Sequence, residues 1–177
     1  MEERIKTPFW KPALIYGVIV GFVGILIGVI FYVMDLSVET WTQWVTGIIG
    51  LAILIYCVVN YRNEYLGGYA SFGQIWKMTI VIGIIGTIIS TIYTYILMGL
   101  IDPELIDKMK MVQEQKLLNN PRIPEAIMDT TLERLDKSMS LNRMIIMGLI
   151  MGPVMYSILG LIIAAFVKKN NPADNVV

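Results

Sequence analysis

The chain has no histidine, one cysteine and few charges, since Asp, Glu, Lys and Arg together make up 16% of its 177 residues. Without histidine it lacks a histidine general base, a histidine zinc ligand and a Ser-His-Asp triad. The lone Cys57 excludes an internal disulfide and a Cys-x-x-Cys site. Lys and Arg number 14, as do Asp and Glu, so no basic excess points to nucleic acid.

Apolar residues are correspondingly abundant and make up 56% of the chain. A soluble domain typically has about 25% charged and about 45–50% apolar residues. This chain therefore has too few charges to cover a water-facing surface of its own size. The composition indicates an integral membrane protein.

Long apolar runs occur four times, and a helix of about 20 residues is enough to cross a bilayer. The second run reaches that length only when Trp41, Trp44 and Tyr61 are counted as its interfacial ends. The first run is too long for a signal peptide and no small-x-small cleavage site follows it, so we expect a retained helix. We predict an all-α, four-transmembrane-helix bundle that forms a single membrane domain. The predicted spans are residues 13–34, 41–61, 75–101 and 144–167.

A sizeable polar loop, residues 102–143, separates the third and fourth spans. Asp102 and Pro103 are typical of the cap and first residue of a helix, and Pro124 of the start of a second one. Apolar residues recur in both segments at spacings of three and four, which predicts two amphipathic helices of about four turns each. Three partners for these faces stay open: the other helix, the bilayer surface or another protein. The apolar positions are Leu105, Met109, Val112, Met128, Leu132, Leu135 and Met139.

Small residues form rows on the first and third predicted spans. Glycines on the first span are spaced 4, 3 and 4 residues apart, which places them on one helix face. Because apolar helices gain little from burial against each other in lipid, small residues mark the positions of close approach. The rows predict either packing within the bundle or contact with a partner protein or a second copy. The candidate interface residues are Gly17, Gly21, Gly24, Gly28, Gly83, Gly86 and Ser90.

The segment that leads into the third span contains residues typical of a helix end and of a helix cap. The glycine pair at residues 67–68 predicts a helix end, and Ser71 predicts the cap of the next helix. Trp76 is expected to anchor that helix at the membrane interface. Gln74 and Lys77 are candidate contacts for an anionic lipid headgroup.

Ionisable groups are nearly absent from the predicted spans, apart from Lys77 near one end. Pumps and ion-coupled transporters normally need such groups within the membrane. No P-loop, glycine-rich nucleotide motif or metal-site spacing occurs. We therefore expect no catalytic residue, no metal site and no cofactor, and predict that the protein is not an enzyme. The alternative enzyme hypothesis depends on three loop carboxylates, Asp102, Glu104 and Asp107.

Four spans place both termini on one side of the membrane. Seven Lys and Arg residues fall on each side, so counting them decides nothing. The long loop carries eight acidic residues beside its seven basic ones, and long loops translocate more readily than short ones. We predict cytoplasmic termini. The basic residues on the terminal side are Arg4, Lys6, Lys11, Arg62, Lys77, Lys168 and Lys169.

Three short motifs resemble a known family. Residues 68–77 read Gly-Tyr-Ala-Ser-Phe-Gly-Gln-Ile-Trp-Lys, residues 101–104 read Ile-Asp-Pro-Glu, and residues 160–169 read Gly-Leu-Ile-Ile-Ala-Ala-Phe-Val-Lys-Lys. With them, essentially the whole chain resembles the DUF4199 family of small four-span membrane proteins, chiefly from Bacteroidetes. The resemblance implies a topology and a source, but no activity. Genes of this family often lie near those of membrane glycosyltransferases, which implies an accessory role in envelope glycan or lipid metabolism.

Small-residue faces without a catalytic constellation predict a non-catalytic accessory or scaffold protein of the bacterial inner membrane. Its expected partners are membrane lipids and either another membrane protein or a second copy of itself, with no nucleic acid. The alternative is a lipid- or small-molecule-handling or transport protein with a cleft beside the third span, next to Gln74 and Lys77.

Overall fold

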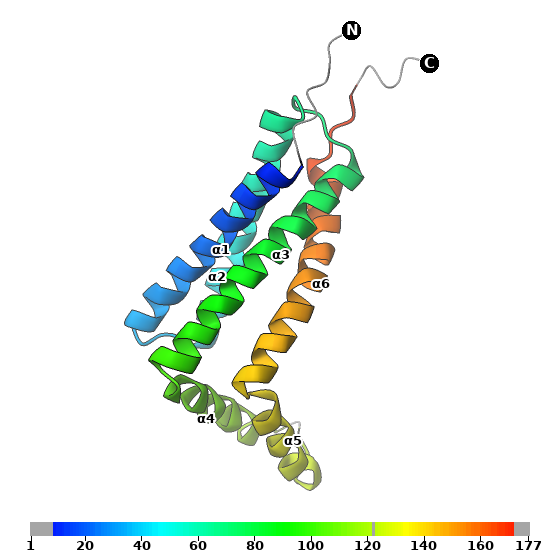
Figure 1. The fold of residues 1–177 in the computed structure, drawn as a ribbon. Helices are drawn as coiled ribbons and strands as arrows, with labels where there is room; N and C mark the ends of the chain where they lie inside the picture. The colour runs from blue at the N-terminus through cyan, green and yellow to red at the C-terminus, as the bar shows by residue number, and fades with distance from the viewer. Residues whose placement is uncertain (1–8, 122, 172–177) are drawn as a thin grey trace.

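A computed structural model describes residues 9–121 and 123–171, and this part of the chain contains no β-strand. Long helices dominate it, with two π-helical turns that extend the second and third spans (Figure 1). The elements are α1 (Trp10–Val33), α2 (Thr40–Asn60), η1 (Tyr61–Tyr65), α3 (Phe72–Ile96), η2 (Leu97–Ile101), α4 (Glu104–Leu118), α5 (Glu125–Ser138) and α6 (Leu141–Val167).

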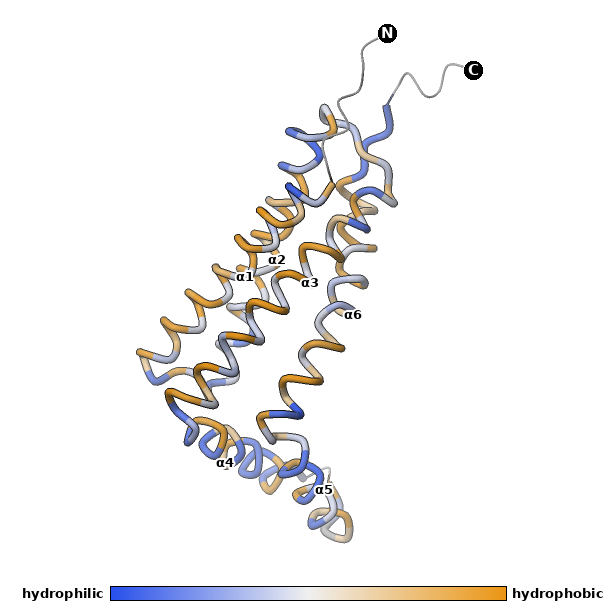
Figure 2. The backbone as a smooth tube through the Cα atoms, viewed as in Figure 1, coloured by the Kyte–Doolittle hydropathy of each residue, from blue (hydrophilic) through white to orange (hydrophobic). Residues whose placement is uncertain are grey.

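Four of these helical segments are long and apolar enough to cross a membrane, which confirms the predicted all-α, four-span fold. They are Trp10–Val33, Thr40–Tyr65, Phe72–Ile101 and Leu141–Val167. Each begins before the predicted span, because the helical hydrogen-bond pattern continues into interfacial residues outside the apolar run. Hydrophobic residues line these four segments, and hydrophilic ones gather in α4 and α5 and at the opposite end of the bundle (Figure 2).

Helix α3 is the centre of the bundle and packs along its length against α1 on one side and α6 on the other (Figure 1). On the α1 side, a Cβ atom built on Gly17 would lie 2.6 Å from the Cβ of Ile85, and one on Gly21 would lie 2.9 Å from that of Ile89. A Cβ on Gly86 of α3 would lie 3.7 Å from the Gly17 carbonyl oxygen. The two backbones therefore approach closely because both contribute glycine.

Glycine also allows close packing at the seam between α3 and α6, and here each helix contributes a glycine that lies against a side chain of the other. Gly83 of α3 lies under the Tyr156 ring of α6, whereas Gly152 of α6 lies against Thr87 of α3. Trp76 also belongs to this seam, since its indole N–H donates to the Ser157 carbonyl oxygen at 3.1 Å. Trp76 thus bonds directly to the neighbouring span, a contact that its predicted role as an interface anchor did not include.

Polar contacts close the end of the bundle where α1 begins and α6 ends. The Arg62 guanidinium donates to the carbonyl oxygen of Val167, the last residue of α6, at 2.9 Å. Next to it, the backbones of Ala70 and Lys169 exchange two hydrogen bonds of 2.9 Å each. Tyr16 of α1 donates to the Glu64 carboxylate at 3.1 Å. All four spans are therefore joined at this end.

The turn that leads into α3 has the glycine pair and the helix cap that the sequence predicts. Gly67 and Gly68 have φ values of +65° and +87°, which only glycine adopts without strain. Ser71 and Gln74 then form a reciprocal capping box, in which each side chain accepts from the other residue's backbone N–H. The predicted cap at Ser71 is confirmed.

At the opposite end, α4 and α5 pack against each other, and Lys110 and Asp136 form an ion pair of 2.7 Å between them. This hydrogen bond raises the pKa of Lys110 above its ordinary value. The pair therefore contributes stability at and below that ordinary pKa, and the contribution is lost as the pH rises through the raised pKa. Helices α4 and α5 therefore contact each other, and six of the seven predicted apolar positions remain partly exposed.

The prediction that the Asp102 side chain caps α4 is wrong. Asp102 stands just before Pro103, but its carboxylate caps no backbone N–H of α4. It accepts instead from the Tyr32 hydroxyl of α1, at 3.3 Å. Pro103 supplies the helical φ of the first turn without a side-chain cap.

We predict that Gly17→Ala destabilises the bundle, because its Cβ atom has no room against Ile85. The matched control is Gly148→Ala on α6, where nothing lies within 4 Å of the added atom. Both changes gain the same helix propensity, so the difference between them measures packing. We expect Gly17→Ala to be the less stable by about 1–3 kcal/mol, or about 5 °C in thermal unfolding in detergent. Equal melting temperatures would contradict the close α1–α3 contact.

Candidate functional site

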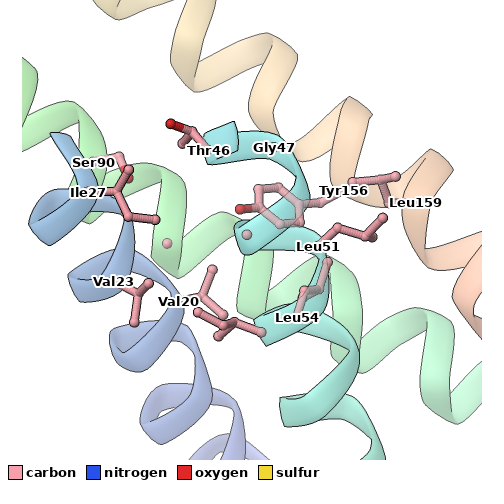
Figure 3. A pocket seen from close by; sticks show the side chains of 14 residues that line it. Val20, Val23, Ile27, Thr46, Gly47, Leu51, Leu54, Ser90, Tyr156 and Leu159 are labelled. Atoms are coloured by element: carbon pink, nitrogen blue, oxygen red, sulfur yellow. The ribbon is translucent and has the colours of Figure 1, made fainter. Parts of the chain in front are cut away.

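A cavity of about 320 Å³ lies among the four spanning helices (Figure 3). We call it the central cleft. Its wall is mainly aliphatic, and three side chains, those of Thr46, Ser90 and Tyr156, bring hydroxyl groups to it. The lining residues are Val20, Val23, Gly24, Ile27, Thr46, Gly47, Gly50, Leu51, Ile53, Leu54, Gly86, Ser90, Tyr156 and Leu159.

The cleft exists because the middle of α2 carries little side-chain volume. Leu54, Cys57 and Val58 of α2 are buried in the core, and Thr42 is buried near the first residue of the helix. Between these buried residues, Gly47 and Gly50 carry no side chain, and nothing lies within 4 Å of a Cβ built on either. The space that larger residues would fill is therefore left empty against α1, α3 and α6.

The cleft lies near the middle of the helices that are long enough to span a membrane. Tyr156 stands 15 residues after Leu141 and 11 residues before Val167, the two ends of α6. At 1.5 Å per residue, these separations correspond to about 22 Å and about 16 Å along the helix. Figure 3 shows the Tyr156 ring reaching from α6 into the space beside α2. A ligand in the cleft would thus be surrounded by hydrocarbon rather than by lipid headgroups.

A second hollow, which we call the α3–α6 groove, has a volume of about 340 Å³. The two helices are in contact at Gly152 and Gly160 but leave this space on the side nearer α4. Ser90 and Tyr156 belong to the walls of both hollows. The other groove residues are Thr87, Thr91, Thr94, Met144, Ile145, Gly148, Met151, Gly152 and Met155.

The lining of the central cleft contains no Asp, Glu, Lys, Arg or Cys. Thr46 uses its hydroxyl to donate to the Thr42 carbonyl oxygen of its own helix, at 2.9 Å. Ser90 and Tyr156 form no hydrogen bond through their hydroxyls within residues 9–121 and 123–171. The cleft can therefore hold an apolar body and bond to a neutral polar group.

The predicted interface residues divide into two groups. Gly17, Gly21, Gly28 and Gly83 pack against side chains of neighbouring helices of the same chain. Gly24, Gly86 and Ser90 line the central cleft. The row on α1 therefore faces α3 and the cleft, and the row on α3 faces α1, α6 and the cleft.

The candidate headgroup contacts, Gln74 and Lys77, lie on the first turns of α3, away from both hollows. The Gln74 side chain is engaged in the capping box. Lys77 is exposed and forms no ion pair with any residue that the structure describes. Among the same described residues, no three Asp, Glu or Cys side chains are grouped so that they could hold a metal ion.

Among the small and polar residues of the cleft, four were not predicted from the sequence: Thr46, Gly47, Gly50 and Tyr156. A sequence signal was present for the last three. Tyr156 is a phenol in the middle of a span, whereas tyrosine favours the membrane interfaces. The glycines of α2, three residues apart, form a further small-residue face on the least hydrophobic of the four spans.

The architecture defines a multi-pass α-helical membrane protein with a cleft at the depth of the lipid chains. A model of the family described as "Protein of unknown function (DUF4199)" matches residues 15–169. The chain belongs to this family, as its motifs predicted. Neither a curated protein nor a solved structure matches it.

One buried hydroxyl group of α3 has no hydrogen-bond partner in the described part of the chain. It is the hydroxyl of Tyr93, which lies beside Gly28. A buried unsatisfied hydroxyl costs free energy. We therefore predict that Tyr93→Phe raises the melting temperature, by about 3 °C for a gain of about 1 kcal/mol. Tyr32→Phe, which removes the bond to Asp102, should lower it, and a lower value for Tyr93→Phe would contradict the prediction.

Proposed function

We propose that this protein is a non-catalytic lipid-binding protein of the bacterial inner membrane, and that it holds the hydrocarbon part of a lipid in the central cleft. The observation that supports this proposal is an aliphatic cavity of about 320 Å³ at the middle of a membrane-spanning bundle. A cavity at this depth is filled by lipid chains unless protein side chains fill it.

The size of the cleft limits what enters it. Ligand pockets range from about 300 to 1,000 Å³, so this one is at the lower end. It has room for one chain or one ring, and the rest of the lipid would remain in the bilayer. Leu51 and Gly47, on the α2 side, are exposed on the surface of the bundle, which gives the ligand a way in from the surrounding lipid.

We expect the variant Gly50→Leu to fill the cleft and displace its lipid. The leucine has room, because nothing lies within 4 Å of the added Cβ, so the fold should persist. Gly73→Leu is the matched control, since Gly73 also has free space but lines neither hollow. The measurement is native mass spectrometry of protein extracted from its own membranes in mild detergent. Wild type and Gly73→Leu should retain one lipid species, and Gly50→Leu about tenfold less.

Equal lipid retention by a folded Gly50→Leu variant, or no retention by wild type, would refute lipid binding in the cleft. The melting temperature of each variant shows whether it is folded. Retained lipid that is a mixture resembling bulk membrane would also count against a specific site.

A second candidate function, an accessory subunit that packs against another membrane protein, is favoured by the α3–α6 groove. The groove lies on the side nearer α4, where side chains of a partner helix have about 340 Å³ to enter. The rows on α1 and α3 make contacts within the chain, which favours the α3–α6 groove as the surface for a partner. A stoichiometric second protein in the same purification, lost on Gly148→Leu but retained on Gly50→Leu, would support this function over lipid binding.

We also propose that α1 begins and α6 ends on the cytoplasmic side. Among the described residues at that end, five basic side chains accompany one acid, Glu64. Because Lys and Arg are tied between the two ends of the whole sequence, the proposal depends on the long polar loop at the other end, since long loops translocate more readily than short ones. Arg4, Lys6 and Arg122 lie outside the described residues. The five basic residues are Lys11, Arg62, Lys77, Lys168 and Lys169.

We predict that Asn119→Cys, in the turn between α4 and α5, reacts with a membrane-impermeant maleimide added from the periplasm. Lys168→Cys should react only after the inner membrane is opened, because it lies at the other end of the bundle. The native Cys57 is buried and should stay unlabelled in both cases. The reverse pattern of labelling would invert the orientation.

A further inference from the structure

Two hydroxyl groups on the wall of the central cleft lack an acceptor. Ser90 and Tyr156 form no side-chain hydrogen bond in the described part of the chain, whereas the Thr46 hydroxyl is used within α2. Hydrocarbon offers no water to satisfy such groups, so an unbonded hydroxyl at this depth is costly. The cleft therefore presents two free donors in otherwise apolar surroundings.

We propose that the ligand is an uncharged lipid whose carbonyl oxygen accepts hydrogen bonds from Tyr156 and Ser90 while its hydrocarbon part fills the central cleft. This inference depends on the proposed function, since it names the chemistry of the lipid that the cleft holds. A carbonyl oxygen has two lone pairs and accepts two hydrogen bonds, so one such oxygen satisfies both unbonded O–H groups.

The charge of the cleft determines the charge of the ligand. None of its lining residues is a Lys, Arg, Asp or Glu, so an ionised phosphate or carboxylate at this depth would have no counter-charge. A lipid with a charged headgroup also keeps that headgroup at the bilayer surface. A lipid without one is free to place its polar oxygen near the middle of the membrane.

The surrounding contacts hold the two donors in place. The Tyr156 ring rests on Gly83, and this close packing fixes the direction in which the phenol extends. The backbone carbonyl oxygen of Ser90 accepts from the Thr94 hydroxyl at 3.0 Å, so Thr94 is bonded within α3 and does not occupy the Ser90 hydroxyl. Because both side chains line the central cleft and the α3–α6 groove, the carbonyl would lie where the two hollows meet.

Two kinds of uncharged lipid carry such an oxygen: a ring carbonyl in a tailed quinone and an ester carbonyl in a diacylglycerol. We would test both on the full-length protein in nanodiscs, each against an analogue without carbonyls. The pairs are decyl-benzoquinone with decylbenzene, and dioctanoylglycerol with its dioctyl ether. Affinity is read from the rise in melting temperature with the mole fraction of probe.

We expect one carbonyl probe to bind wild type about tenfold more tightly than its analogue. Tyr156→Phe and Ser90→Ala should each reduce this advantage by about threefold to fivefold, with the affinity for the analogue unchanged. Both changes delete a hydroxyl and retain the rest of the side chain. The controls Tyr95→Phe and Ser157→Ala delete hydroxyls outside both hollows and should change nothing.

The pattern of results separates this inference from the proposed function. If all four probes bind but carbonyl and analogue bind equally, or if neither hydroxyl deletion alters their ratio, the inference is wrong and lipid binding stands. If no probe binds wild type, both fail. A preference for the quinone pair or for the glycerol pair supports the inference and names the source of the carbonyl.

Discussion

The close approach of α3 to α1 and to α6 is the contact on which the rest of the molecule depends. In a bilayer, apolar side chains gain nothing by exchanging lipid for protein, so helices associate where their backbones come near enough for dispersion contacts. Gly17 and Gly21 allow this on one side of α3, and Gly152 allows it on the other. The helix that makes fewer such contacts, α2, is the one beside which space remains.

Glycine thus has two opposite effects in this bundle. Where a neighbour supplies a large side chain, as Ile85 does for Gly17, the absence of a Cβ lets the two helices pack tightly. Where no neighbour reaches in, as at Gly47 and Gly50, the missing side chain becomes a cavity. The hydroxyl groups on the wall of this cavity are its only polar side-chain groups, so they are the groups that can form hydrogen bonds to a ligand there.

Hydropathy predicted the four spans, and turn chemistry predicted the cap at Ser71, because both depend on residues close together in sequence. Contacts between distant residues followed no local pattern. The local sequence predicted that the Asp102 carboxylate caps a helix, yet this carboxylate accepts a hydrogen bond from the Tyr32 hydroxyl, 70 residues away. The rows on α1 and α3 showed that close approach would occur, but not which helix would be met. The central cleft was missed because it depends on how four helices stand together.

The walls of the central cleft come from segments that are synthesised far apart in time. Helices α1, α2 and α3 precede the polar loop, and α6, with Tyr156 and Leu159, follows it. Membrane insertion proceeds from the amino terminus, so the first three spans are in the bilayer while one wall of the cleft is still missing. The backbone bonds between Ala70 and Lys169 form only when α6 is complete. The cleft is therefore finished last during biogenesis, and a ligand that fills it would favour full-length chains over interrupted ones.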